Sequence, residues 1–369
     1  MPEYFIGLMS GTSLDGVDGV LADFSTAPPT VLAHASRPFP SSLRAELLAL
    51  NSSGADELQR AALAGNALVR AYSHVVTELL AGTRIPASSV VAIGAHGQTV
   101  RHRPQEFDGT GYTLQLNQPA LLAELSGIDV VADFRSRDVA AGGQGAPLAP
   151  FFHQALFAEP GKSVGVLNIG GISNITLLRA DGSMLGFDCG PGNALMDGWI
   201  HQHQGEDYDS EGSWAAGGQV LPDLLQRLRA DPYFGRMPPK STGRDLFNRP
   251  WLDGHLKGSG SAAPQDVQAT LAELTAAACA AEVLRHEPRL ARLIVCGGGA
   301  LNTHLMRRLQ ALLPGAAVIA SSEAGLPPLQ VEATAFAWLA RKTVRREKLE
   351  LQSTTGARGA RVLGCVYPA

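Results

Sequence analysis

The chain has few cysteines and no surplus of positive charge. Its four cysteines, at positions 189, 279, 296 and 365, form no Cys-x-x-Cys pair and have no zinc-type spacing to histidine. Lys and Arg number 30 against 34 Asp and Glu, and the net charge is −4. Because nucleic-acid binding needs a basic surface, this balance predicts no nucleic-acid partner.

Long apolar runs are also missing. The stretch 269–284 comes nearest to the ~18–20 residues of a membrane span, but Glu273 and Glu282 interrupt it. The N-terminus enters a strand directly, without the charged and apolar regions of a signal peptide. Since the cysteines are expected to be reduced thiols, we expect a cytoplasmic protein with no membrane partner.

Several common catalytic patterns are absent from the sequence. It has no GxSxG elbow and no HExxH, and the spacing of Asp15 and Asp18 does not fit an EF-hand. The composition is ordinary for a globular protein, with 369 residues, 45% of them hydrophobic and 17% charged. This length suggests two or three domains.

The most informative segment is 4–18, with the sequence YFIGLMSGTSLDGVD. An apolar, β-prone run reaches a Ser-Gly-Thr-Ser turn and then continues as a second apolar run, which predicts a strand, a turn and a strand. Such a turn directs N–H groups and hydroxyls at one point, as phosphate oxygens require. It lacks the lysine of a GxxxxGK[ST] loop. Asp15 and Asp18 add carboxylates suited to a metal-bound water.

A second copy of this plan occupies 164–178, with the sequence VGVLNIGGISNITLL. Each half of the chain later has an apolar strand that ends in a glycine-containing loop, at 93–97 and at 295–299. The similarity lies in the order of elements rather than in residue identity. It predicts a duplicated α/β unit, with two lobes around a cleft that holds a ligand near the glycine loops.

Helical periodicity covers 41–82, 119–125, 265–286 and 331–346, and residues 139–147 are interpreted as a hinge. Asp188 ends an apolar strand before a Gly-Pro-Gly turn, where a carboxylate can accept a proton from a hydroxyl or a water. It can equally satisfy only the N–H groups of its own turn. The two candidate phosphate loops favour the catalytic interpretation.

Polar side chains follow other strand ends. His96 and Thr99 follow one strand and Arg135 follows another, positions that suit a small molecule with many hydroxyls, although His96 alone is more typical of a packed histidine. The loop 240–245 is polar and basic and suits a phosphate or a substrate carboxylate. Glu332 lies at a helix start, where the helix dipole already favours a carboxylate.

Taken together and in order, these motifs resemble those of the bacterial anhydro-N-acetylmuramic acid kinases across essentially the whole chain. The sequence departs from that pattern in two places, with Cys189 where the family has Thr and Asp245 where it has Glu. The segments that carry the resemblance are 6–18, 96–99, 133–135, 168–174, 187–193 and 240–244.

The resemblance implies an α/β protein with two duplicated actin/hexokinase-like (ribonuclease H-like) lobes, each with a mixed sheet, and an ATP cleft between them. The lobes are expected at 1–140 with 345–369 and at 141–344. It also implies ATP and Mg²⁺ as cofactors and a homodimer. The implied reaction opens the 1,6-anhydro ring of 1,6-anhydro-N-acetylmuramic acid with water and phosphorylates O6, in peptidoglycan recycling.

Within that resemblance, Asp188 is the expected general base, and residues of the glycine turns are the expected ATP contacts. Thr99, Arg135 and Glu332 are the expected sugar contacts. The expected ATP contacts are Gly11, Thr12, Ser13, Leu14, Asp15, Gly16, Val17, Asp18, Gly170, Gly171, Ser173, Asn174, Gly297, Gly298 and Gly299.

Two alternatives stay open at this stage. One is another sugar kinase of the same superfamily that opens no ring. The other is a non-catalytic, actin-like nucleotide-binding protein.

Overall fold

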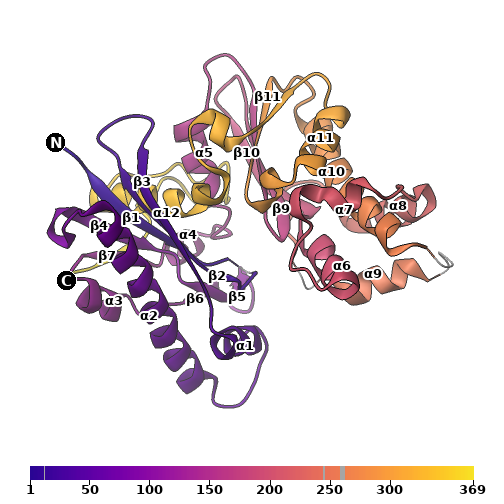
Figure 1. The fold of residues 1–369 in the computed structure, drawn as a ribbon. Coiled ribbons are helices and arrows are strands. Elements are labelled where there is room, and N and C mark those ends of the chain that lie inside the picture. Colours follow the sequence, from indigo (N-terminus) through magenta and orange to yellow (C-terminus); the bar gives the residue numbers. More distant parts are fainter. Residues whose placement is uncertain (12, 244–245, 258–261) are drawn as a thin grey trace. The chain divides into compact units, whose positions relative to one another are not determined.

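The chain folds into two compact units in a computed structural model that describes residues 1–11, 13–243, 246–257 and 262–369 (Figure 1). The first unit comprises 1–152 and 330–369, and the second comprises 153–329. The predicted lobes placed 141–152 and 330–344 with the second half of the chain, whereas the contacts within the structure group both segments with the first unit.

The first unit contains a six-stranded sheet in the order β13-β7-β4-β1-β2-β3. β1 and β2 form the predicted antiparallel hairpin, and β4 and β7 continue the sheet in parallel. A separate two-stranded sheet pairs β5 with β6. The strands are β1 (Tyr4–Met9), β2 (Gly16–Asp23), β3 (Thr30–Pro38), β4 (Val90–Ala95), β5 (Gln98–Pro104), β6 (Gly111–Leu116), β7 (Val130–Ala132) and β13 (Cys365–Tyr367).

Helices cover both faces of this sheet. A Cβ at Gly19 of β2 would meet Val75 and Leu79 of α2, whereas a Cβ at Gly7 of β1 would meet the backbone of α12. Because Gly19 pairs with Leu8, the neighbour of Gly7, the two helices lie on opposite faces. The helices of this unit are α1 (Ser41–Ala49), α2 (Glu57–Thr83), α3 (Pro119–Ser126), α4 (Ser136–Ala140) and α12 (Val331–Val344).

The second unit contains a five-stranded sheet in the order β10-β9-β8-β11-β12. β8, β9 and β10 are antiparallel neighbours, and β11 and β12 extend the sheet in parallel with β8. The strands are β8 (Val164–Ile169), β9 (Ile172–Leu178), β10 (Met184–Pro191), β11 (Arg292–Cys296) and β12 (Ala317–Ala320).

Helices also pack against the sheet of the second unit. α10 packs against β9 and β10 and lies in the main core, while His153 of α5 bonds Thr176 of β9. The helices are α5 (Ala149–Phe157), which spans the unit boundary, α6 (Ala194–Gln204), α7 (Ser213–Ala216), α8 (Pro222–Arg229), α9 (Arg249–Leu256), α10 (Pro264–His286) and α11 (Thr303–Leu312). Short 3₁₀ segments are η1 (Ala87–Ser89), η2 (Ser210–Gly212), η3 (Pro232–Gly235), η4 (Gly298–Leu301), η5 (Ser321–Ala324) and η6 (Pro328–Gln330).

The two sheets confirm the predicted duplication. Read from β3, the first five strands of the first sheet are β3-β2-β1-β4-β7, before β13, and the second sheet runs β10-β9-β8-β11-β12. In both, three antiparallel strands are followed by two that are parallel to the first strand of the unit. This is the mixed, ribonuclease H-like sheet expected for each lobe of the actin/hexokinase-like fold.

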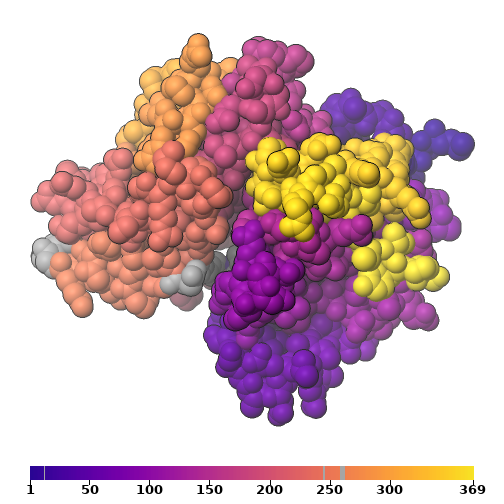
Figure 2. All heavy atoms as spheres, turned by 180° about the vertical axis from the view of Figure 1, so that it is seen from behind, coloured from indigo at the N-terminus to yellow at the C-terminus, as the bar shows by residue number. Residues whose placement is uncertain are grey.

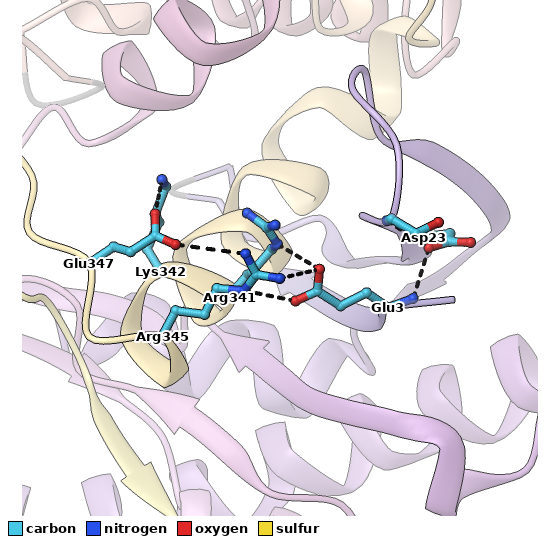
Figure 3. Close-up of polar contacts among 7 residues, drawn as sticks. Glu3, Asp23, Arg341, Lys342, Arg345 and Glu347 are labelled. Atoms are coloured by element: carbon cyan, nitrogen blue, oxygen red, sulfur yellow. Dashed lines mark hydrogen bonds and ion pairs between the residues drawn. The ribbon is translucent and has the colours of Figure 1, made fainter. Parts of the chain in front are cut away.

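The C-terminal part of the chain is fastened to the first unit. The carboxylate of Glu3 contacts Arg341 at 3.1 Å and Arg345 at 2.7 Å, and Lys342 pairs with Glu347 (Figure 3). The C-terminal part of the chain, yellow in Figure 2, lies against the surface of the first unit. The segment after α12 contacts residues 138–144, where Thr355 donates its hydroxyl to buried Asp138. These contacts explain why α12 belongs with the N-terminal strands.

One helix among the residues with described positions, α10, is long and apolar enough by length and composition to cross a membrane. The apolar run is therefore longer than the sequence analysis predicts. Within the protein, 89% of its most apolar stretch is buried. Its two glutamates are paired, Glu273 with Arg308 and Glu282 with Lys240, so the helix has the character of a core helix.

Candidate functional site

Asp188 lies on β10, an edge strand of the second sheet, and its side chain accepts one hydrogen bond among the described residues. Its Oδ2 accepts the backbone N–H of Thr242 at 3.0 Å. Its backbone N–H faces the carbonyl of Lys240 at 3.3 Å, and its carbonyl accepts the hydroxyl of Tyr233 at 2.8 Å. The partners are thus far away in sequence, and its own turn does not supply them.

The environment of Asp188 suits a proton acceptor. Burial raises the pKa of Asp188 from 3.8 to about 6, while the N–H of Thr242 and the charge of Lys240 act in the opposite direction. A general base works best when its pKa lies near the operating pH. Asp188 is therefore ionised at neutral pH and basic enough to take a proton from water.

The predicted second phosphate loop lies directly beside Asp188. The register of the sheet pairs Asp188 with Asn174 of β9, Asn174 with Asn168 of β8, and Asn168 with Cys296 of β11. Side chains at paired positions share one face, so these four residues form a row across four strands. The side-chain amide oxygen Oδ1 of Asn168 is buried and has no hydrogen-bond partner among the described residues.

Backbone contacts connect this loop to the turn after Asp188. The N–H groups of Gly192 and Asn193 donate to the carbonyls of Gly171 and Gly170, at 2.9 and 2.8 Å. A Cβ at Gly192 would stand 2.3 Å from the Gly170 carbonyl. The side-chain amide of Asn193 donates to Ile169 at 3.2 Å and does not cap α6, although Asn193 does occupy the N-cap position.

The glycine turn 297–299 packs against the end of β8. Gly297 has φ of 75°, and a Cβ there would stand 2.4 Å from Oδ1 of Asn168. A Cβ at Gly299 would meet the side chain of Ile169, and one at Gly298 would lie 3.3 Å from the Asn193 amide. Within the second unit, the structure thus brings together Asp188, the 170–174 loop and the 297–299 turn.

The predicted first phosphate loop, 11–18, belongs to the first unit, and Thr12 lies outside the described residues. The loop backbone is held by the segment after β4. Gln98 donates its amide to the Gly11 carbonyl at 3.0 Å, and the hydroxyl of Ser10 donates to the Gly97 carbonyl at 3.0 Å. Leu14 is buried, has φ of 59° and donates its N–H to Gly11 at 3.2 Å. Gly16 and Val17 are already part of β2.

His96 connects this loop to Arg135. Its Nε2 accepts from Nη2 of Arg135 at 3.0 Å, and because arginine can only donate, the proton lies on Nδ1, 3.2 Å from the Ser10 carbonyl. Burial and the charge of Arg135 lower the pKa of His96 to about 3. His96 is therefore a neutral packed histidine whose two ring nitrogens are both used.

The predicted sugar contacts lie in the first unit. Arg135 also donates to the Gly145 carbonyl at 2.9 Å. Burial lowers the pKa of Arg135 to about 10, while the carboxylate of Glu332 at the start of α12 acts to raise it. The structure thus brings Arg135 and Glu332 into electrostatic contact. Thr99, at the start of β5, accepts the amide of Gln115 at 3.2 Å.

The basic loop 240–245 is interpreted from the sequence as a phosphate contact, but its Lys240 is placed differently in the structure. Arg244 and Asp245 lie outside the described residues. The ammonium of Lys240 is buried and paired with Glu282 at 2.9 Å, so it is not available to a ligand phosphate. Sequence reasoning missed Tyr233 as a neighbour of Asp188 and Glu282 as the partner of Lys240. They lie 45 and 42 residues away in sequence from their partners Asp188 and Lys240, with no local signal.

The carboxylates of the first loop suit a magnesium ion that arrives with phosphates. The side chains of Asp15 and Asp18 are 68% and 48% exposed, with Arg44 at 3.7 Å and His34 at 3.4 Å. Among the residues that the structure describes, no group of three or more metal-ligating side chains lies together. Mg²⁺ commonly uses one or two carboxylates, waters and substrate phosphates, so these residues fit such an ion.

Comparisons with known proteins identify the family to which the chain is similar. A family model described as anhydro-N-acetylmuramic acid kinase matches residues 3–369. A protein of that name from Variovorax paradoxus (strain S110) is 67% identical over 372 residues, covering 100% of this chain and 99% of the relative. One from Albidiferax ferrireducens is 61% identical, covering 100% of both. Among solved structures, an activator of 2-hydroxyisocaproyl-CoA dehydratase from Clostridium difficile with bound ADPNP is similar, with 13% identity, a TM-score of 0.48, and coverage of 93% of this chain and 96% of that chain.

Proposed function

Because the chain belongs to the anhydro-N-acetylmuramic acid kinase family, and is thus a sugar kinase that uses ATP, we propose that it both opens the anhydro ring and phosphorylates the sugar. The substrate is 1,6-anhydro-N-acetylmuramic acid, and the product is N-acetylmuramic acid 6-phosphate. The observation that carries the proposal is Asp188, a carboxylate with a pKa of about 6 beside a glycine loop.

In this reaction, Asp188 takes a proton from the water that attacks C1. The new C1–O bond forms as the bond between C1 and O6 breaks, and O6 becomes the nucleophile toward the γ-phosphorus of ATP, with ADP as the leaving group. The N–H of Thr242 orients the carboxylate throughout. Phosphoryl transfer relies on positioning and charge stabilisation, so glycine loops without a Walker lysine suffice.

In this proposal, the other expected residues bind ATP, Mg²⁺ or the sugar. Residues 11–18 of the first unit, and 170–174 with 297–299 of the second, contact ATP. Mg²⁺ neutralises phosphate charge when bound and is held near Asp15 and Asp18. Thr99, Arg135 and Glu332 contact the sugar. We further propose a cytoplasmic homodimer, in line with the reduced cysteines and the family resemblance.

The test is a mass measurement of the product formed from 1,6-anhydro-N-acetylmuramic acid and ATP. We expect a product heavier than the substrate by one water and one phosphoryl group. The matched acceptor is N-acetylmuramic acid, which is the same sugar without the 1,6-anhydro ring. Turnover of this acceptor at an equal rate, with a product heavier by the phosphoryl group alone, would favour the sugar kinase that opens no ring.

The rate should depend on pH through Asp188. A carboxylate acts as a base only when deprotonated, and burial raises the pKa of Asp188 to about 6. We therefore expect kcat/KM to fall about tenfold per pH unit below pH ~6 and to level off above it. The measurement is a pH profile of the free enzyme in buffers of constant ionic strength. An acid limb near pH 4, the ordinary range of aspartate, would contradict the assignment.

A further inference from the structure

A buried ion pair between Lys240 and Glu282 lies next to the strand segment that carries Asp188. The ammonium of Lys240 is 2.9 Å from Oε1 of Glu282 on α10, and both side chains are 2% exposed. The same ammonium lies 4.8 Å from the ring centroid of Tyr233 and 5.8 Å from that of Phe187. Lysine is almost never fully buried unless it is paired, so ion pair and rings together enclose this charge.

The segment that carries Lys240 also supplies the contacts of Asp188. The carbonyl of Lys240 faces the N–H of Asp188 at 3.3 Å, and two residues later the N–H of Thr242 binds Oδ2 at 3.0 Å. Tyr233, whose ring the ammonium touches, donates its hydroxyl to the Asp188 carbonyl at 2.8 Å. Apart from the bonds of the sheet, the described hydrogen bonds of Asp188 are thus formed by Lys240 itself, by Thr242 two residues later and by Tyr233, whose ring contacts the Lys240 ammonium.

The loop reaches around the edge of the sheet. Phe187 belongs to the core that contains residues of α10, and alternation along β10 places Asp188 on the opposite face. The Lys240 side chain therefore anchors the loop on the α10 face, while Thr242 reaches the face that carries the carboxylate. Because β10 is an edge strand, no other described strand pairs with its outer side, where the carbonyl of Lys240 faces the N–H of Asp188.

We propose that the Lys240–Glu282 pair is the positioning device of the catalytic base: it fixes the 240–242 segment against β10 and keeps the Asp188 carboxylate oriented and ionised for proton transfer. This rests on the proposed function, in which Asp188 is the base. Stability alone does not account for the pair, because a buried ion pair is often no more stabilising than apolar residues of the same volume.

Lys240 is the cation that acts on Asp188 within the described residues, where its charge lowers the pKa of the carboxyl against the effect of burial. Other titratable groups pack close by on β10, η3 and α10, and burial raises the pKa values of Cys189 and Tyr233 and lowers that of His286. Among the described residues, the titratable and charged groups around Asp188 and its neighbours are Cys189, Tyr233, Arg236, Lys240, Cys279, Glu282, Arg285 and His286.

The test compares pH profiles of kcat/KM. The double variant Lys240→Met/Glu282→Gln removes both charges together, so that neither is left buried alone. We expect its acid limb to move to higher pH by about one unit, with ATP affinity unchanged. Lys240→Arg keeps the charge and should return the limb toward the wild-type position. The matched control is Lys162→Met/Glu159→Gln, an exposed pair of the same unit at 2.9 Å, which should leave the limb in place.

The outcomes separate this proposal from the proposed function. A double variant with the wild-type acid limb and turnover, beside an inactive Asp188→Asn, overturns the positioning role and leaves the function standing. Normal turnover by Asp188→Asn overturns both. If the double variant turns over too slowly for a profile, a ¹³C-carboxyl NMR titration of Asp188 measures the same displacement, and an unmoved titration overturns the proposal.

Discussion

Replacing Asp188 by asparagine should lower turnover by about three orders of magnitude, while the affinity for ATP stays within about twofold. The amide has the shape of the carboxylate and still offers an oxygen to the Thr242 N–H, which lies 3.0 Å from Oδ2 in the native protein. What it loses is the ability to accept a proton at neutral pH. The measurements are steady-state turnover and ATP binding by calorimetry.

Loss of stability should not contribute to this result. Since burial raises the pKa of Asp188 above its unfolded value, this carboxyl group favours the folded state below its unfolded pKa, and that contribution is lost as pH rises through about 6. At pH 7 the folded protein therefore bears the cost of a buried charge. The neutral amide removes that cost, so the variant should melt at the wild-type temperature or above it.

The control is Asp181→Asn, in the exposed turn between β9 and β10 of the same unit. It removes one negative charge from the same unit without touching the site, and it should turn over normally. Retention of more than about a tenth of the wild-type rate by Asp188→Asn would remove Asp188 as the base, because proton transfer by a positioned side chain contributes about 10²–10⁴-fold.

The hairpins that open each unit were predictable because their signals are local. In β1–β2 and β8–β9, an apolar run, a turn of small residues and a second apolar run follow one another directly, so pattern and structure share the same short window. The duplication followed from the order of such windows. Asp188 could be singled out for the same reason, since it lies between an apolar strand and a glycine turn.

Features that depend on distant partners were not predictable. The periodic segment 41–82 gives two helices, because residues 50–56 leave the helical path between α1 and α2. The assignment of 331–344 to the C-terminal lobe overlooked that α12 packs on β1, more than 300 residues earlier. The partners of Asp188 arrive from 240–242 in the same way, and no spacing in the sequence indicates such a contact.

The close packing of α12 on the first sheet depends on Gly7, which lies within segment 6–18, one of those that carry the family resemblance. A Cβ at Gly7 would stand 1.9 Å from the Ala333 carbonyl and 2.7 Å from the Ala337 nitrogen. Both atoms are helix backbone, which cannot rotate away as a side chain can. A Cβ at Gly94 on the neighbouring strand would likewise stand 2.1 Å from the Phe336 carbonyl. Glycine thus lets the helix that carries Glu332 lie directly on the strands.

Gly7→Ala should therefore destabilise the protein by about 3 kcal/mol or more, at or beyond the upper end of ordinary overpacking. Urea unfolding of the full chain measures the change. The control is Gly82→Ala on α2, where a Cβ would meet nothing within 4 Å, and which should be neutral or stabilising by up to about 1 kcal/mol. Equal unfolding midpoints for Gly7→Ala and Gly82→Ala would mean that α12 does not rest on β1 as closely as the structure has it. Because Glu332 lies in the first turn of this helix, the Gly7 variant should also raise the KM for the sugar more than the KM for ATP.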